Sequence, residues 1–459
     1  MPKSSAIAAT PTTIGMISLG CAKNMVDSEI IAAHARSAGF AMAPRPEQAD
    51  IVIVNTCAFI HDAQEESIDA ILEACAWKAA GHCRAVMVCG CLPQRYRYAL
   101  ARELPEVDAF IGLDAIPEIG QTLRRLDTGE RNIRLITKTA EKIIEPPPGR
   151  PLFTNGAYAY LKVAEGCNHR CAFCAIPAIR GAYRSRPIAA IVREAEELLQ
   201  RGVRELNLIS QDITAYGCDL NNGNDLPRLL RALNDIGGRF WIRLLYGHPA
   251  HVTEKLLDTI GELPRVCHYL DLPIQHSHPA ILTAMRRPQP HGGLESLFQT
   301  IRRHLPDVTL RTTCLLGFPG ETADHFDHLL DFTTAIRFNH LGVFEFSPEV
   351  GTHAVKLKRR VPKAVIQQRV RRLMLRQQHR VKAAGLARIG QTDLMLIDAP
   401  APRRLGVMLA RPAACAPEVD GIVYLTNPTR QCRPGTFVRA RYTGARGYDM
   451  EAEPFKRGA

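Results

Sequence analysis

Three cysteines in one short loop, G-C-N-H-R-C-A-F-C, are the residues most clearly suited to chemistry. Cys167, Cys171 and Cys174 lie close enough in sequence for one loop to bring three thiolates to one metal centre. Iron–sulfur clusters are usually held by four cysteines, so a set of three leaves one iron free to bind another molecule. A zinc site usually needs four ligands, and no nearby cysteine or histidine completes such a set well. The loop therefore favours an iron–sulfur cluster with an open iron.

Three other cysteines each follow a short apolar run. Cys21 follows IGMISLG, Cys57 follows IVIVNT and Cys91 follows AVMVCG. These runs have the length and composition of buried strands, and helix-like stretches separate them. Because strands that alternate with helices form a parallel sheet, whose carboxyl ends meet at one edge, we expect all three cysteines at that edge. Cys89 lies two residues before Cys91 and could share a face with it in an extended segment.

The rest of the sequence predicts two further domains. The proline-rich stretch 145–151 cannot continue a helix or a central strand, so we expect a linker there. Six strand-like runs separated by helical stretches follow it and predict a full or partial (β/α) barrel. Short strands separated by glycine and proline come last and predict a small β-barrel or sandwich. We therefore expect a multidomain α/β protein with domains at 12–144, 153–385 and 388–458.

Composition and charge narrow the class of protein. The chain is 46% hydrophobic and 23% charged, which excludes a disordered or fibrous protein. Its net charge of +12 suits an anionic partner such as nucleic acid or a ribosome surface. Segment 356–382 holds eleven Lys or Arg and no acid, and is either a solvated helix face or a contact for an RNA-rich or acidic surface. With no apolar run of ~18 residues and no convincing signal peptide, we expect a cytoplasmic protein without a membrane partner.

The cysteine loop, placed after the first strand of a β/α array, resembles the radical S-adenosylmethionine (SAM) superfamily. This resemblance implies a [4Fe–4S] cluster on Cys167, Cys171 and Cys174, whose open iron binds SAM. It also implies reductive cleavage of SAM to methionine and a 5′-deoxyadenosyl radical. Phe173 matches the position that contacts the adenine in that superfamily, although it could simply pack in the loop.

Other SAM contacts are predicted from their places at strand ends. Ser210 and Gln211 end the second barrel strand and could bond the amino group of SAM. Arg243 and Gln275 lie near later strand ends and could bind its carboxylate or ribose. Each of the four could instead be a structural polar group. We assign no catalytic side chain beyond the cluster ligands.

Longer stretches resemble the radical SAM methylthiotransferases over essentially the whole chain. They include SLGCAKNMVDSE, NTCAFI, GCLPQRY and LKVAEGCNHRCAFCAIPAIRGAYRSRP. The resemblance implies an N-terminal domain with a second [4Fe–4S] cluster on Cys21, Cys57 and Cys91, a central radical SAM partial barrel and a C-terminal TRAM barrel. The family pattern selects Cys91 over Cys89. Ala22 departs from the pattern, which often has proline there.

Three stretches resemble the RimO type of this family: AEGCNHRCAFCAIPAIRG, LISQDITAYG and YLDLPIQHSHPAILTAMRRP. That type methylthiolates the β-carbon of an aspartate in small-subunit ribosomal protein S12, with one SAM as methyl donor and a second as radical source. The implied partners are ribosomal protein S12 or the small ribosomal subunit, an electron donor such as flavodoxin or ferredoxin, and a sulfur donor. Two alternatives stay open: a tRNA adenosine methylthiotransferase of the MiaB type, and a non-catalytic iron–sulfur RNA-binding sensor.

Overall fold

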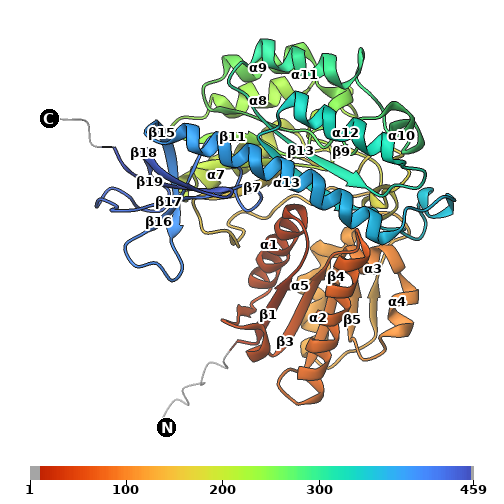
Figure 1. Cartoon of the computed structure of the whole chain (residues 1–459). Helices are drawn as coiled ribbons and strands as arrows, with labels where there is room; N and C mark the ends of the chain where they lie inside the picture. The colour runs from red at the N-terminus through yellow and green to blue at the C-terminus, as the bar shows by residue number, and fades with distance from the viewer. Residues whose placement is uncertain (1–10, 456–459) are drawn as a thin grey trace, which may run out of the picture. The chain divides into compact units, whose positions relative to one another are not determined.

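The computed structural model describes residues 11–455 of the chain (Figure 1). This part of the chain forms two compact units. The first contains the residues up to Pro151 together with Ala178–Ala182, and the second contains Leu152–Pro177 and the residues from Tyr183 onward. None of the helices in 11–455 is both long enough and apolar enough to cross a membrane.

A six-stranded parallel sheet forms the centre of the first unit, with strand order β2-β1-β3-β4-β5-β6. The neighbouring strands β1, β3 and β4 are the three predicted apolar runs. Every residue of β3 and β4 is buried, as expected for parallel strands covered on both faces. The predicted N-terminal α/β domain is therefore confirmed. The elements are β1 (Thr13–Ser18), α1 (Ala22–Ser37), β2 (Ala41–Met42), β3 (Ile51–Thr56), α2 (His61–Ala79), β4 (Ala85–Gly90), α3 (Cys91–Tyr96), α4 (Tyr98–Glu103), β5 (Ala109–Ile111), α5 (Ile119–Asp127) and β6 (Ile133–Leu135).

A second six-stranded parallel sheet, in the order β14-β13-β12-β11-β10-β7, forms the centre of the second unit. All six predicted strands are present, and the sheet is open, so the barrel is partial. Helix α9 packs between α8 and α11 (Figure 1). The elements are β7 (Tyr158–Lys162), β8 (Ala164–Glu165), β9 (Arg184–Ser185), α7 (Ile188–Gln200), β10 (Glu205–Ile209), α8 (Leu226–Asn234), β11 (Trp241–Leu244), α9 (Glu254–Glu262), β12 (Val266–Asp271), α10 (Pro279–Ala284), α11 (Gly293–His304), β13 (Thr309–Leu316), α12 (Ala323–Ile336), β14 (His340–Glu345) and α13 (Lys363–Arg388). The residues of the short helix α6 (Ile176–Arg180) are divided between the two units.

The second unit ends in a closed five-stranded barrel with the order β15-β16-β17-β19-β18. Its interior is a small apolar cluster that includes Met395, Ile397 and Leu425. The barrel confirms the predicted small β domain, although the sequence did not indicate its last strand. The strands are β15 (Thr392–Pro400), β16 (Met408–Pro412), β17 (Val423–Leu425), β18 (Phe437–Arg446) and β19 (Asp449–Pro454).

Buried charges join this barrel to the amino-terminal ends of the parallel strands. Arg411 of β16 binds both carboxylate oxygens of Asp398 at 2.7 and 2.9 Å, and contacts Glu205 of β10 at 2.7 Å. Burial opposes the charge on Glu205, but Arg411 and Arg243 outweigh it and lower the pKa of this carboxyl. The phenol of Tyr158 donates to Glu418 at 2.7 Å. The barrel is therefore fixed at the edge of the sheet opposite the strand ends that precede the cysteine loop.

Replacing Arg411 with methionine should lower the free energy of unfolding by about 3–5 kcal/mol, because it leaves Glu205 and Asp398 buried without their shared cation. Thermal and urea denaturation of the purified protein measure the loss. Arg441→Met is the matched control, because Arg441 pairs with Glu453 at an exposed site and should cost no more than about 1 kcal/mol. Equal stability of the two variants would contradict a structural role for Arg411.

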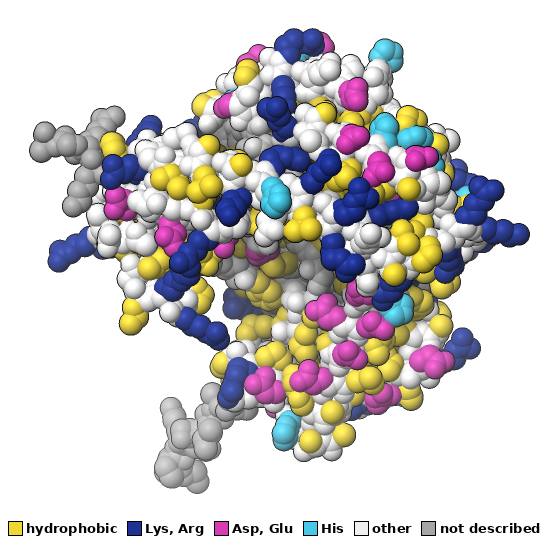
Figure 2. Space-filling view, in the orientation of Figure 1, with side chains coloured by type: hydrophobic (Ala, Val, Ile, Leu, Met, Phe, Trp, Pro, Cys, Tyr) yellow, Lys and Arg dark blue, Asp and Glu magenta, His cyan; other side chains and the backbone are white. Residues whose placement is uncertain are grey.

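The basic segment forms most of α13, and Figure 2 shows Lys and Arg side chains gathered over this helix. Part of its charge is structural, because Arg369 pairs with Glu321 at 2.5 Å and Arg372 with Asp327 at 3.2 Å. Arg371 is exposed and has no ion pair among the residues described. A contact with an RNA-rich or acidic surface therefore stays a prediction for this outer face.

Candidate metal centres

The cysteine loop follows β7 and β8 and is held in place through its backbone. The Ala172 N–H donates to the Met285 carbonyl at 2.8 Å, and the Ala172 carbonyl accepts from the Ala354 N–H at 2.7 Å. The Asn168 side chain accepts from the Tyr183 N–H at 2.9 Å. These bonds fix the loop on both sides of its central cysteine.

The three thiols of the loop lie near one another, as the predicted cluster requires. Burial raises the pKa of Cys167 to about 11 and that of Cys174 to about 12, and the charge of Cys171 adds to both shifts. A guanidinium nitrogen of Arg287 lies 3.8 Å from the Cys171 sulfur. The three cysteines are partly buried, and each thiolate disfavours the ionisation of its neighbours, whereas a bound metal takes the place of the thiol protons. The three residues therefore fit an iron–sulfur cluster with three protein ligands.

A cavity of about 670 Å³ opens beside Cys167. Its walls include His169, Tyr183, Asp212 and His251. This volume is in the range of small-molecule sites, which are typically about 300–1,000 Å³. The cavity can therefore hold a ligand of nucleoside size next to the cysteine loop.

Asp212, at the end of β10, connects the cysteine loop to the next strand end. It accepts hydrogen bonds from His169 and His251, both at 2.8 Å. Burial favours the neutral acid, but these bonds outweigh it and hold the pKa of Asp212 well below its usual range. The same bond raises the pKa of His251. Asp212 is therefore an anion that anchors the histidine inside the cysteine loop.

His169, His248 and His251 lie close enough together to share a metal ion. The ring of His248 stacks on His169 at 4.1 Å, and its Nδ1 accepts the Ala250 N–H at 3.2 Å. Burial lowers the pKa of His248 to about 2, so this ring is neutral and carries its proton on Nε2. His248 thus offers no free lone pair, and the cluster is better described as hydrogen-bonded than as metal-binding.

Sequence reasoning missed this cluster, although a signal for it existed. Asp212 directly follows the two residues that we singled out at the end of β10, and His248 and His251 follow β11. If every polar residue that follows a predicted strand had been considered, rather than a few of them, Asp212, His248 and His251 would all have been identified.

Four of the predicted SAM contacts lie beyond the carboxyl ends of strands. Phe173 packs against an apolar group that contains Phe318. Ser210 is buried directly after β10, and the Gln211 side chain donates to Glu165 at 2.8 Å. Gln275 follows β12 with a φ of +68°.

Arg243 lies elsewhere, inside β11 and fully buried. Its Nε donates to Glu205 at 2.6 Å and its Nη1 to the Ala413 carbonyl at 2.7 Å. The guanidinium is thus part of the contact between the sheet and the β-barrel. We therefore leave Arg243 out of the proposed SAM site.

The second cysteine trio is assembled by the sheet of the first unit. Cys21 precedes α1, Cys57 directly follows β3, and Cys91 begins α3 after β4. Because β1, β3 and β4 are adjacent and parallel, their carboxyl ends meet at one edge. Burial raises the pKa of Cys91 to about 12, and the charges of Cys57 and Cys21 add to this shift. The three thiols are therefore neighbours although they are far apart in sequence, and they too fit a cluster.

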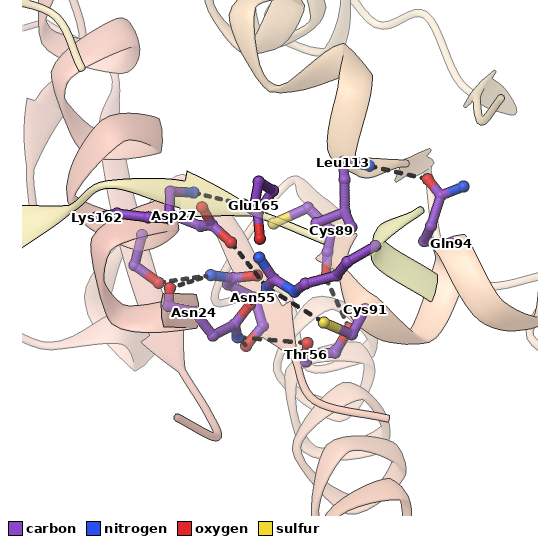
Figure 3. A network of polar contacts seen from close by, with 12 residues as sticks. Asn24, Asp27, Asn55, Thr56, Cys89, Cys91, Gln94, Leu113, Lys162 and Glu165 are labelled. Carbon is purple, nitrogen blue, oxygen red and sulfur yellow. Dashed lines mark hydrogen bonds and ion pairs between the residues drawn. The ribbon is translucent and has the colours of Figure 1, made fainter. Parts of the chain in front are cut away.

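Cys89 lies in β4, two residues before Cys91, but faces a different environment. It is fully buried, and its sulfur lies 3.7 Å from the Val54 carbonyl, to which the thiol donates. The Cys89 thiol lies near the side chains of Asp27 and Cys91. The Cys91 thiol, in contrast, lies near the thiols of Cys57 and Cys21. Figure 3 shows both cysteines in the polar network at this edge. The geometry favours Cys91 as the third ligand.

Buried polar bonds fix the loops that carry this trio. The Asn55 side chain donates to Ser28 at 2.7 Å, and the Thr56 hydroxyl donates to the Cys89 carbonyl at 2.6 Å (Figure 3). Arg180 belongs to the segment 178–182 of the first unit and donates to Asp27 at 2.9 Å. The same nitrogen of Arg180 lies 3.3 Å from the Cys91 sulfur.

An open parallel sheet with a C-x₃-C-x₂-C loop after its first strand defines a radical SAM protein. Family comparisons agree with this class. Residues 161–333 match the radical SAM superfamily, residues 389–454 match the TRAM domain, and residues 13–112 match an uncharacterized protein family named UPF0004.

Similar curated proteins narrow the class from radical SAM proteins in general to one family. It is 44% identical over 445 residues to the ribosomal protein uS12 methylthiotransferase RimO of Syntrophus aciditrophicus, covering 96% of this chain and 98% of the relative. The RimO of Symbiobacterium thermophilum is 42% identical, with 97% and 92% covered, and that of Geobacter sulfurreducens is 40% identical, with 96% and 98% covered. The chain belongs to the RimO family of radical SAM methylthiotransferases.

Solved structures share the fold at low sequence identity. A radical SAM methyltransferase of Kitasatospora setae, TsrM, with cobalamin and a [4Fe–4S] cluster bound, is 15% identical with a TM-score of 0.55, covering 75% of this chain and 74% of that one. The cobalamin-dependent radical SAM enzyme OxsB is 11% identical with a TM-score of 0.52, covering 80% and 56%. These similarities concern the fold alone.

Proposed function

We propose that this enzyme methylthiolates the β-carbon of an aspartate in ribosomal protein S12. The observation that supports this most strongly is the full-length similarity, at 40–44% identity, to relatives named for that protein substrate. The two cysteine trios, each at the carboxyl ends of parallel strands, provide the two metal sites that such a reaction needs.

Cys167, Cys171 and Cys174 would hold the first [4Fe–4S] cluster. When bound and reduced, this cluster and SAM supply a 5′-deoxyadenosyl radical that abstracts a hydrogen atom. A radical is needed because the β-C–H bond of an aspartate is not acidic enough for an ordinary base. The chain's part is to hold the loop still, through Ala172 and Asn168, and to offer SAM the strand ends at Ser210 and Gln275.

Cys21, Cys57 and Cys91 would hold a second cluster, which supplies the site where the incoming sulfur is carried and methylated. Asn55 and Thr56 hold the loops on which two of these cysteines lie. One SAM would provide the methyl group and a second the radical. Electrons would come from a protein such as flavodoxin or ferredoxin, and sulfur from a separate donor.

The test is an in vitro reaction with the iron-loaded protein, a reductant, sulfide, small ribosomal subunits, and SAM deuterated at its methyl group. We expect ribosomal protein S12 to gain a deuterated methylthio group at one aspartate, located by fragment mass spectrometry. Modification of added tRNA instead would favour the tRNA branch of the family. Binding of iron without cleavage of SAM would favour the sensor alternative.

A further inference from the structure

Each cysteine trio has one arginine beside one of its sulfur atoms. Arg180 lies 3.3 Å from the Cys91 sulfur, and Arg287 lies 3.8 Å from the Cys171 sulfur. A guanidinium is always charged in proteins and is a strong donor to anionic acceptors such as thiolates. The two arginines therefore look equivalent until their other partners are compared.

Arg180 is part of a neutral pair. Its guanidinium forms an ion pair with Asp27 at 2.9 Å, and both side chains are buried. Asn24 accepts a longer bond from the same nitrogen, at 3.4 Å. The charge of Asp27 therefore offsets part of the positive charge that Arg180 brings to Cys91.

Arg287 has no such partner. Its second contact is the carbonyl of Pro273, which is uncharged. Among the described residues, no carboxylate lies within ion-pair distance of this guanidinium. Arg287 is partly buried, and its guanidinium stays charged as it does throughout proteins. Arg287 thus brings to the Cys171 sulfur a positive charge that no ion pair offsets.

The histidines and the carboxylate nearest to Arg287 form no ion pair with it. His248 is neutral, as its buried ring and the bond from Ala250 require. Asp212 attracts Arg287 only from a longer range, and it accepts hydrogen bonds from His169 and His251. The end of α10 positions the arginine, because the Arg287 N–H donates to the Leu282 carbonyl at 3.0 Å.

We propose that Arg287 raises the reduction potential of the cluster on Cys167, Cys171 and Cys174. This inference rests on the proposed function, because it requires that the trio holds a cluster. Reduction adds one electron to the cluster, so a nearby cation stabilises the reduced form more than the oxidised form. Net charge and hydrogen bonds to the sulfur atoms are established determinants of iron–sulfur potentials. Arg287 would thereby ease the electron transfer that SAM cleavage requires.

The test is a redox titration of the full-length, iron-loaded protein without SAM, followed by electron paramagnetic resonance. The relevant signal is the one that is lost in a Cys171→Ala variant. In Arg287→Met, the ratio of reduced to oxidised cluster at a fixed solution potential should fall about tenfold, which is about 59 mV for a one-electron couple. Arg287→Lys keeps the charge and should stay close to the wild type.

Arg286→Met is the matched control, because Arg286 is the exposed neighbour and its loss removes the same charge from the chain. We expect the reduction potential of the cluster in Arg286→Met to equal that in the wild type. An unchanged potential in Arg287→Met, or an equal shift in Arg286→Met, would overturn the proposal. So would weaker SAM binding without a shift, which would assign Arg287 to the SAM carboxylate. If Arg287→Met does not load iron, Arg287→Gln serves in its place, because its amide can still donate to Pro273.

Failure of this inference differs from failure of the proposed function. If the wild-type protein holds no cluster on the Cys171 trio, the proposed function is wrong. If the protein holds the cluster and cleaves SAM, but the reduction potential of the cluster does not change in Arg287→Met, only the role of Arg287 is wrong.

Discussion

Replacing Cys171 with alanine should lower the production of 5′-deoxyadenosine from SAM by at least about 100-fold. Losing a residue that supports a metal ligand already costs about 10- to 100-fold in affinity or activity, and losing one of three ligands should cost more. Chromatography of the reaction with a strong reductant measures the product. Because the radical would form before any sulfur is transferred, methylthiolation should disappear with it.

Cys432→Ala is a suitable control for this experiment. Cys432 belongs to the apolar interior of the β-barrel and lies outside both cysteine trios. It should produce 5′-deoxyadenosine at the wild-type rate. Normal production by Cys171→Ala would show that the cluster ligands lie elsewhere.

Replacing Cys91 with alanine should separate the two halves of the reaction. We expect methylthiolated product to fall below detection, while cleavage of SAM to 5′-deoxyadenosine continues, because the trio around Cys171 is untouched. Iron analysis should show the loss of about one cluster per chain. The reason is geometric, since Cys91 is the cysteine of β4 and α3 that neighbours both Cys57 and Cys21.

Cys89→Ala is the control that tests whether the effect is specific to Cys91. The Cys89 thiol points to the Val54 carbonyl inside the sheet, so its loss should cost about 1 kcal/mol of stability and leave both iron content and product formation intact. A Cys89→Ala variant that loses product while Cys91→Ala keeps it would reverse the ligand assignment.

The strands and the cysteines at their ends could be predicted from the sequence for a physical reason. Buried parallel strands are short apolar runs, and β3 and β4 are buried at every position. Once these runs are recognised as parallel neighbours, their carboxyl ends must meet, which brings Cys57 and Cys91 to one edge. The choice between Cys89 and Cys91 needed the structure, because in an extended segment the two could share a face.

The partners of buried charged groups could not be predicted in this way. Arg243 lies in β11, a strand of the second parallel sheet, but its partners Glu205 and Ala413 come from distant parts of the chain. Arg287 and Arg180 have no sequence motif that links them to a cysteine. Such pairings depend on tertiary packing, which local pattern does not encode.

The most direct test of the central claim is mass spectrometry of ribosomal protein S12, together with tRNA nucleosides, from cells with and without this gene. We predict that S12 carries a methylthio group in place of one hydrogen only when the gene is present. The gene with Cys171→Ala should not restore this group, and tRNA should be unaffected. An unmodified S12 in the presence of the gene, or the loss of a methylthioadenosine when the gene is removed, would contradict the account.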